Sequence, residues 1–157
     1  MGGTPAVKCG NRHFQFVPHG CFRCSGEDNW IVVAATNGDM WQRLALVIGR
    51  PDWSKDASLK SVEARRAVEN VIETGITAWT LSRDADEAMS DLQAAKVAAG
   101  VARLPIDLLK DRHLRSRAFL QELERAFMGL HLQPSMPIRE GVGPYPISSG
   151  ADARTAQ

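Results

Sequence analysis

Residues 17–53 read VPHGCFRCSGEDNWIVVAATNGDMWQRLALVIGRPDW, and this stretch decides the fold. Residues 30–35 form a continuous apolar run rich in β-branched side chains, which is typical of a strand covered on both faces. A tight polar turn over residues 26–29 precedes this run, and we expect an earlier strand over residues 19–25. A helix is predicted over residues 38–48. The stretch therefore predicts strand, turn, strand and helix in succession.

The predicted helix has clear start and stop signals. Asn37 is a good N-cap because its side chain can accept a hydrogen bond from an amide of the first turn. Gly49 is expected to end the helix, and Pro51 to prevent its resumption. The apolar stripe that faces the core follows helical spacing and consists of Trp41, Leu44, Ala45 and Ile48.

Working outward, the pattern predicts two more long helices. One starts after Ser61 and runs to about Thr80, although Gly75 weakens its middle by roughly 1 kcal/mol relative to alanine. The next starts at Asp84, whose spacing from Glu87 resembles a capping box, and stops at Gly100. A short strand over residues 101–104 and a short helix from Pro105 to Lys110 are expected after it.

Residues 118–133 are ambiguous. The composition of residues 118–127 favours a helix, whereas Gly129 and the residues after it would suit a hairpin. Residues 1–18 show little periodicity and are interpreted as an extended lead-in. From residue 134 to 157, Pro, Gly and Ser accumulate, so an extended or disordered tail is predicted.

Charge and hydropathy exclude several function classes. The formal net charge of the 157 residues is +1, so no basic field indicates nucleic acid or an anionic membrane surface. The basic clusters at residues 65–66 and 112–117 are interpreted as solvated helix faces. No apolar run reaches the roughly 20 residues of a membrane span. The first residues contain no apolar core of a secretory signal, so we expect a cytoplasmic protein.

The three cysteines do not predict a metal or redox site. Cys21 and Cys24 have CxxC spacing, but a zinc site needs a second pair of ligands, which Cys9 and the scattered histidines do not supply at standard spacing. On a strand, the two CxxC side chains would also face opposite sides. We therefore expect reduced thiols that act as small apolar side chains and no bound metal.

Seven motifs, in order and at matching spacing, resemble the small domain of family III CoA-transferases. That family includes formyl-CoA transferase, carnitine CoA-transferase and alpha-methylacyl-CoA racemase. The motifs are Pro18-His19-Gly20; the GEDNW turn at 26–30; Asp39 and Trp41 with the GRPDW at 49–53 and Asp56; Arg65 with Trp79-Thr80; the LQAA and VAAGV at 92–101; the DRHLRSRAF at 111–119; and residues 129–139 ending in Pro-Ile-Arg.

The resemblance implies an α+β small domain over residues 19–133, with a short antiparallel sheet packed by several helices and extended terminal segments. It also favours the hairpin at residues 118–133 over the helix. In such relatives a larger domain carries the aspartate nucleophile and the CoA-binding segments, and two chains interlock as a dimer. CoA then moves between carboxylic acids through acyl-aspartyl anhydride and aspartyl thioester intermediates. The small domain supplies a loop that closes over the substrate.

The resemblance points to four substrate-lid candidates and to no catalytic residue: Pro18, His19, Gly20 and Asn37. For His19, a surface or turn histidine without a ligand is favoured over a substrate-facing residue. Asn37 stands where racemases carry an active-site glutamate, and because an amide cannot shuttle protons, the transferase branch is favoured. The sequence also departs from the family pattern at Lys96, where glycine is usual. Arg65 is expected to pair with a carboxylate inside the domain rather than with CoA.

Two function hypotheses follow. The first is a stand-alone or truncated substrate-lid domain that lacks the aspartate nucleophile, is inactive alone and works with a large-domain CoA-transferase chain in trans. Coenzyme A would be a substrate, and no cofactor would be bound tightly. The alternative is a non-catalytic binding or oligomer-assembly module, in which apolar surface exposed by loss of the large domain drives association, with a homo-oligomer as the expected form. Its candidate contributors are Phe14, Phe16, Phe119 and Phe127. A third interpretation is the product of a gene remnant that folds but has no function.

Overall fold

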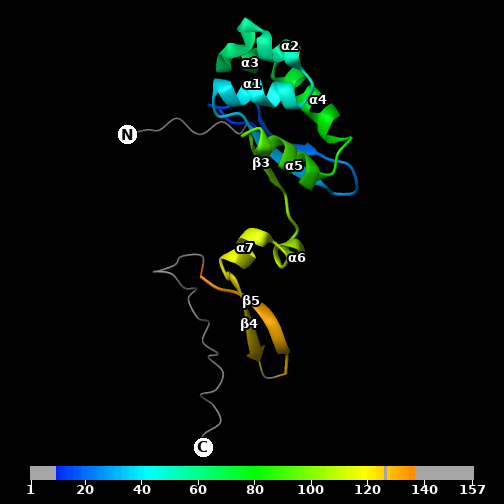
Figure 1. Ribbon diagram of the computed structural model, residues 1–157, viewed down its shortest axis with the longest axis vertical. Coiled ribbons are helices and arrows are strands. Elements are labelled where there is room, and N and C mark those ends of the chain that lie inside the picture. The colour runs from blue at the N-terminus through cyan, green and yellow to red at the C-terminus, as the bar shows by residue number, and fades with distance from the viewer. Residues whose placement is uncertain (1–9, 126, 137–157) are drawn as a thin grey trace, which may run out of the picture. The chain divides into compact units, whose positions relative to one another are not determined.

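A computed structural model describes residues 10–125 and 127–136 of the chain. It divides into two compact units, residues 1–102 and residues 103–157, which are described separately. Figure 1 shows the elements of each. The fold is α+β, as predicted, with helices and short antiparallel strands. The prediction that residues 19–133 form one domain stays a prediction.

The first unit contains a three-stranded antiparallel sheet in the order β1-β2-β3. Its strands are β1 (His19–Arg23), β2 (Trp30–Ala34) and β3 (Ala98–Val101). In β2, the side chains of Ile31 and Val33 are fully buried, whereas Val32 between them is 41% exposed. The expectation that this strand is covered on both faces is therefore wrong. Antiparallel sheets commonly bury one face and leave the other in solvent.

Helix α1 (Gly38–Val47) begins and ends where the sequence predicts. The Asn37 side chain accepts a hydrogen bond from the Met40 amide, and Trp41, Leu44 and Ala45 are buried. Gly49 ends the helix in the left-handed region with φ of +73°. Pro51 does not simply terminate the helix, because it occupies the first turn of a new short helix, α2 (Pro51–Lys55), where a missing amide hydrogen has no cost.

The helix predicted from Ser61 to Thr80 is interrupted. Ser61 caps α3 (Val62–Ala67), which follows the short 3-10 helix η1 (Ala57–Lys60). The backbone then leaves helical geometry at Val68, with φ of −118°, before α4 (Glu69–Thr80) begins. The break leaves Arg65 and Glu69 both buried on either side of it.

Helix α5 (Ala85–Ala94) starts after Asp84, whose side chain accepts a hydrogen bond from the Asp86 amide. The helix ends before Gly100, contrary to expectation, and Lys96 makes the left-handed turn with φ of +58°. Gly100 instead pairs with Val32 inside β3, so the strand predicted over residues 101–104 begins three residues earlier. Val97 is fully buried at this turn, which fixes the chain reversal.

The core of the first unit lies where the helices cover the sheet. Helix α4 contacts β1, and α5 contacts β2 and β3, while α1 packs against α2 and α5. The shared buried cluster includes Ile31, Val33, Trp41, Leu44, Trp53, Ile72, Ile76 and Leu92. Three of the four tryptophans, Trp41, Trp53 and Trp79, are buried. Trp30 is half-buried and its indole nitrogen donates to Asp28.

The second unit contains two short helices and a hairpin. Helices α6 (Pro105–Leu108) and α7 (Arg112–Ser116) precede β4 (Leu120–Arg125) and β5 (Gly129–Pro134), which pair antiparallel. The hairpin implied by the resemblance is confirmed, and the helix favoured by composition is wrong. Phe127 and Gly129 adopt φ of +70° and +69° at the turn. Most of the predicted tail, residues 137–157, lies outside the described residues, as do residues 1–9 of the lead-in.

Candidate functional site

The Pro18–His19–Gly20 segment forms the beginning of β1 and is tied to the end of β2. The buried Pro18 carbonyl accepts a hydrogen bond from the Ala35 amide over 2.9 Å, and His19 lies opposite Ala34 in the sheet register. Gly20 is buried against the Phe22 ring, because a Cβ on Gly20 would lie 3.0 Å from Phe22 Cζ. Within this part of the chain, only His19 presents a half-buried polar side chain.

The His19 imidazole is oriented by a backbone carbonyl. Its Nδ1 lies 2.7 Å from the Asn11 carbonyl oxygen. A carbonyl oxygen only accepts, so Nδ1 carries the proton, and in the neutral ring Nε2 is then an acceptor. The ring lies 5.4 Å from that of His13, which is itself stacked between Phe14 and Phe16. His19 is therefore a positioned side chain.

Arg65 holds the residue that precedes this segment. Its side chain is 1% exposed, and its Nε donates to the Val17 carbonyl over 2.7 Å. One terminal nitrogen donates to the carbonyls of Leu59 and Lys60 over 2.9 and 2.8 Å. Burial lowers the pKa of Arg65 from its ordinary value, and the charge of Glu63 opposes that shift. The expected carboxylate partner is thus wrong: three carbonyl oxygens take that place, which makes the role structural.

Two more arginines connect residues 12–14 of the lead-in to α3 and α4. Arg66 donates to the carbonyls of His13 and Phe14 over 2.8 and 3.0 Å. Arg12 forms a bidentate pair with the Glu73 carboxylate, with Nε 2.8 Å from Oε1, a geometry that gives the strongest ion pairs. The interpretation of residues 65–66 as a solvated helix face is therefore wrong, since both side chains bind backbone carbonyls.

Asn37 lies at the same end of the sheet as His19, because His19 pairs with Ala34, three residues before Asn37. Its side-chain oxygen is engaged by the Met40 amide at 2.8 Å. The predicted N-cap role is confirmed. Whether Asn37 or the Pro18–Gly20 segment also covers a substrate stays a prediction.

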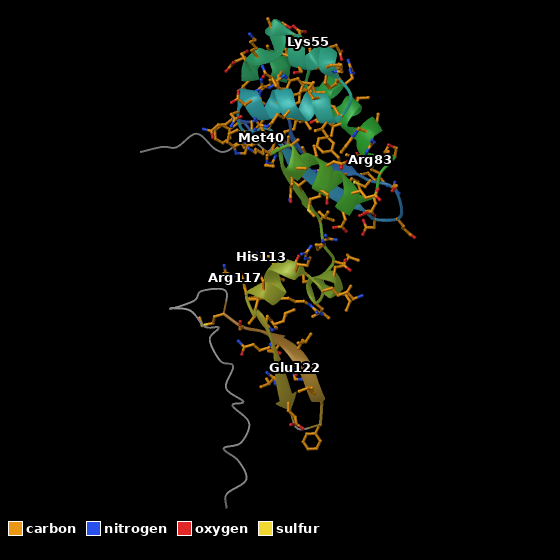
Figure 2. All side chains as sticks on the ribbon, viewed as in Figure 1. Met40, Lys55, Arg83, His113, Arg117 and Glu122 are labelled. Carbon is orange, nitrogen blue, oxygen red and sulfur yellow. The ribbon has the colours of Figure 1, made fainter. Side chains whose placement is uncertain are left out.

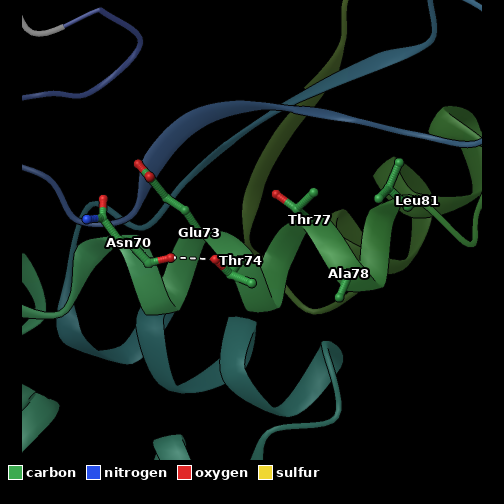
Figure 3. A pocket seen from close by; sticks show the side chains of 6 residues that line it. All are labelled: Asn70, Glu73, Thr74, Thr77, Ala78 and Leu81. Carbon is green, nitrogen blue, oxygen red and sulfur yellow. Dashed lines mark hydrogen bonds between the residues drawn. The ribbon is translucent and has the colours of Figure 1, made fainter.

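Two neighbouring grooves lie on α4. Figure 3 shows the larger, about 490 Å³, with side chains of α4 projecting into it; it is lined by Asn70, Glu73, Thr74, Thr77, Ala78 and Leu81. The second, about 410 Å³, shares Glu73 and Thr77 with it and is otherwise lined by Asn11, Arg12, Gly20, Cys21 and Phe22. The second groove thus joins the lid candidate Gly20 to Asn11, the residue that orients His19. Its lining contains an ion pair and hydroxyl and amide groups, which suit polar binding rather than covalent chemistry.

Among the described residues no group of His, Cys, Asp and Glu side chains is arranged to hold a metal ion, and Cys21 and Cys24 are free thiols. Burial raises the pKa of both Cys21 and Cys24, and the charge of Asp84 raises that of Cys24 further. Both thiols are therefore protonated near neutral pH, which agrees with their interpretation as apolar side chains.

Sequence reasoning missed Asn11, Arg12 and Glu73. Asn11 and Arg12 are adjacent and lie about sixty residues before Glu73, and none of the three belongs to a motif. No local signal identifies such a set, because only the packing of the lead-in against α4 brings it together. A third cavity of about 300 Å³ adjoins the start of α1, and its lining includes Asp39, Trp41 and Asp56, which belong to one of the seven motifs.

The sequence of this chain is similar to those of known CoA-transferases. The sequence model of CoA-transferase family III matches residues 1–151. The probable CoA-transferase Rv1866 of Mycobacterium tuberculosis is 30% identical over 82% of this chain and 16% of its own length. The formyl-CoA:oxalate CoA-transferase of Rhodopseudomonas palustris (strain BisB18) is 26% identical over 92% of this chain and 35% of its own length.

Solved structures share the fold. A CAIB/BAIF family protein from Brucella suis superposes with a TM-score of 0.70 at 21% identity, over 86% of this chain and 34% of that one. Rv3272 from M. tuberculosis superposes with a TM-score of 0.66 at 23% identity, over 81% and 35%. The chain thus spans about a third or less of the proteins it matches. With the family match covering almost all of its residues, this chain belongs to CoA-transferase family III.

Proposed function

We propose that residues 1–157 act as the substrate-lid domain of a CoA-transferase and do not transfer CoA by themselves. A larger domain, on a separate chain in trans, would supply the aspartate nucleophile and the CoA-binding segments. CoA thioesters would be the substrates, with no cofactor bound tightly. Reduced thiols and a CoA-dependent reaction favour the cytoplasm as the site of action.

The observation that carries this proposal is the held Pro18–Gly20 segment. Arg65 donates a hydrogen bond to the Val17 carbonyl next to the segment, and the Ala35 amide donates to the Pro18 carbonyl. The Asn11 carbonyl orients the ring of His19. A segment whose rotamers and backbone are already fixed can cover a reactive intermediate without a large ordering cost.

The chemistry requires such a cover. In the proposed complex, the aspartate carboxylate of the larger domain attacks the acyl thioester, forming an anhydride and releasing CoA as its thiolate. The thiolate then attacks the aspartyl carbonyl, releasing the first carboxylate and leaving an aspartyl thioester. An acceptor carboxylate reacts with this thioester to continue the exchange. Water would hydrolyse either intermediate, so exclusion of water raises the yield of transfer.

The test combines this chain with a larger domain. We would co-produce it with the part of the R. palustris formyl-CoA:oxalate CoA-transferase that lies outside the matched segment. Transfer of CoA between labelled carboxylic acids would be followed, together with free-CoA release as a measure of hydrolysis. The expected result is no transfer by this chain alone and transfer by the mixture. Transfer by the purified chain alone, or none by a mixture that forms a stable complex, would overturn the proposal.

Matched variants sharpen the assay. His19→Ala removes the oriented imidazole and should raise the ratio of hydrolysis to transfer severalfold. His113→Ala removes an exposed histidine of α7 and should leave that ratio unchanged. For Asn37, Asn37→Asp keeps the cap whereas Asn37→Ala removes it. Transfer by Asn37→Asp that equals the parent's would restrict Asn37 to its structural role as the N-cap.

A non-catalytic assembly module is the second candidate function, and the exposure of two phenylalanines favours it. Phe14 is 75% exposed and Phe127 is fully exposed, while Phe16 and Phe119 are half-buried. Light scattering of the purified chain separates the candidates. A concentration-independent oligomer that ignores CoA esters favours assembly, and a monomer that assembles only with the larger domain favours the lid.

A further inference from the structure

The described residues of the second unit bury very few side chains. Among its described residues, from Arg103 onward, only Leu123 is buried. Its sheet is a single two-stranded ribbon, β4-β5, and an isolated ribbon of this kind is marginally stable at best in water. Below about 70–80 residues a hydrophobic core alone supplies little stability, and such units usually gain it from staples or from a partner. The hairpin therefore requires a surface that covers it.

One face of the hairpin has a defined chemical pattern. The register pairs Glu122 with Leu132 and Glu124 with Leu130, and directly opposed residues of an antiparallel pair lie on the same face. The four side chains, which we call the Leu–Glu face, are all exposed; Leu130 is 66% and Leu132 is 40% exposed. Figure 2 labels Glu122 on β4. The buried Leu123 points to the opposite face, because successive side chains of a strand alternate.

The same unit exposes further apolar side chains. Phe127 and Met128 at the hairpin turn are exposed, and so are Leu104 and Ile106 around the start of α6. Exposed apolar side chains gathered on a small unit favour an interaction role. Two carboxylates beside two leucines also define the partner, since buried glutamates need cations to compensate for their lost hydration.

We propose that the Leu–Glu face docks onto the larger part of the CoA-transferase fold, at an apolar surface flanked by lysine or arginine. This inference rests on the proposed function. The match to the R. palustris relative covers 92% of this chain but only 35% of that protein. In such relatives the segment matching this chain is accompanied by about twice its own length of further polypeptide. The Leu–Glu face would need this apolar surface of the larger part whether that part lies on a separate chain or elsewhere on the same polypeptide.

The experiment measures assembly rather than turnover. The full chain and the part of the R. palustris protein outside the match carry different tags, are co-produced, and are analysed by affinity retention and light scattering. Leu130→Ser/Leu132→Ser and Glu122→Lys/Glu124→Lys should each weaken retention at least tenfold. Leu46→Ser/Val71→Ser alters two similarly exposed apolar residues of the first unit and should not. Because all these side chains are exposed, each variant of this chain without the partner should unfold at the same thermal midpoint as the parent chain.

A chimera covers the case in which the separate larger part aggregates. This chain replaces the matched segment of the R. palustris protein, and the same variants are compared by thermal unfolding. The hairpin variants should lower the midpoint of the chimera but not of the free chain. Equal losses of thermal midpoint in the chimera and in the free chain would overturn the proposal. Affinity retention that the hairpin variants leave unchanged would overturn it as well.

The remaining outcomes identify which idea has failed. A dimer of this chain alone that the leucine variants dissociate would make a second copy the occupant and overturn the docking proposal. A complex that depends on the Leu–Glu face but transfers no CoA would support docking and overturn the proposed function. Transfer that survives the hairpin variants would overturn docking alone.

Discussion

The indole of Trp53 lies against the backbone of Gly75: a Cβ on Gly75 would be 2.5 Å from Trp53 Cη2. Trp53 is buried, stacks on Trp41 with ring centroids 5.9 Å apart, and has the Arg50 guanidinium 3.8 Å from its ring centroid. The glycine that weakens α4 by propensity is therefore the residue that admits a core tryptophan. Its helix cost is offset by the packing of a large aromatic side chain.

Gly75→Ala should destabilise the protein despite the higher helix propensity of alanine. The gain of about 1 kcal/mol in propensity is outweighed by overpacking, which costs about 1–3 kcal/mol. We expect a lower free energy of unfolding in urea. Trp53→Leu makes room for the methyl group, so the double variant should lose less than the sum of the two single losses. A stabilised Gly75→Ala protein would contradict the packing of these two residues.

Arg65→Met should lower the free energy of unfolding by about 3 kcal/mol, because it leaves buried carbonyl oxygens without donors. Those carbonyls belong to Val17, Leu59 and Lys60. Arg65→Lys keeps the charge but not the fork of donors, so it should lose less. Arg66→Met, on the half-buried neighbour, is the control and should lose about 1 kcal/mol. Guanidinium denaturation gives these values, and nitrogen NMR of His19 should report a changed ring environment in the Arg65 variants only.

Lys96→Gly should stabilise the protein by about 1 kcal/mol. Lys96 adopts φ of +58° after α5, a conformation that costs an L-residue about 1–2 kcal/mol and glycine almost nothing. Calorimetry would show a higher thermal midpoint. Lys96→Ala removes the same exposed side chain without relieving the backbone, so its midpoint should stay close to the parent's. If both variants behaved alike, backbone strain would not be the cause.

The two described thiols predict a loss of stability at alkaline pH. Their pKa values are raised in the folded protein by burial, so the folded state favours the neutral form. Their contribution is fully present below the ordinary thiol pKa of about 8.5. It falls as the pH rises through that value, because the unfolded chain ionises first. Urea midpoints in a Cys9→Ser background should therefore drop more steeply above pH 8.5 than those of a further Cys21→Ser/Cys24→Ala variant. Parallel curves would exclude the effect.

The local signals in the sequence were reliable where the structure depends on a few neighbouring residues. Asn37 and Asp84 cap their helices, and Gly49 ends α1 with positive φ. These features are fixed by side chains that reach only two or three residues along the chain, so the sequence alone contains the necessary information. The order of the motifs likewise determined the family.

Propensity failed where tertiary contacts compete with it. Residues 120–125 have a helical composition but form a strand, because pairing with residues 129–134 and burial of Leu123 favour the extended form. The expected stop at Gly100 failed for a similar reason. The buried Val97 and the pairing of β3 with β2 place the end of α5 earlier than the glycine does.

The sequence by itself determined the family, the helix caps and the first two strands, since each rests on short-range chemistry or on motifs in fixed order. Only the tertiary structure decided what Arg65 and Gly75 do. A buried guanidinium finds its acceptors wherever packing brings carbonyl groups, and Val17 is 48 residues away along the chain. The role of Gly75, which has no side chain, can be recognised only when the Trp53 ring is seen in the space that a side chain would fill. Neither relationship leaves a local pattern, because both arise when distant segments share one core.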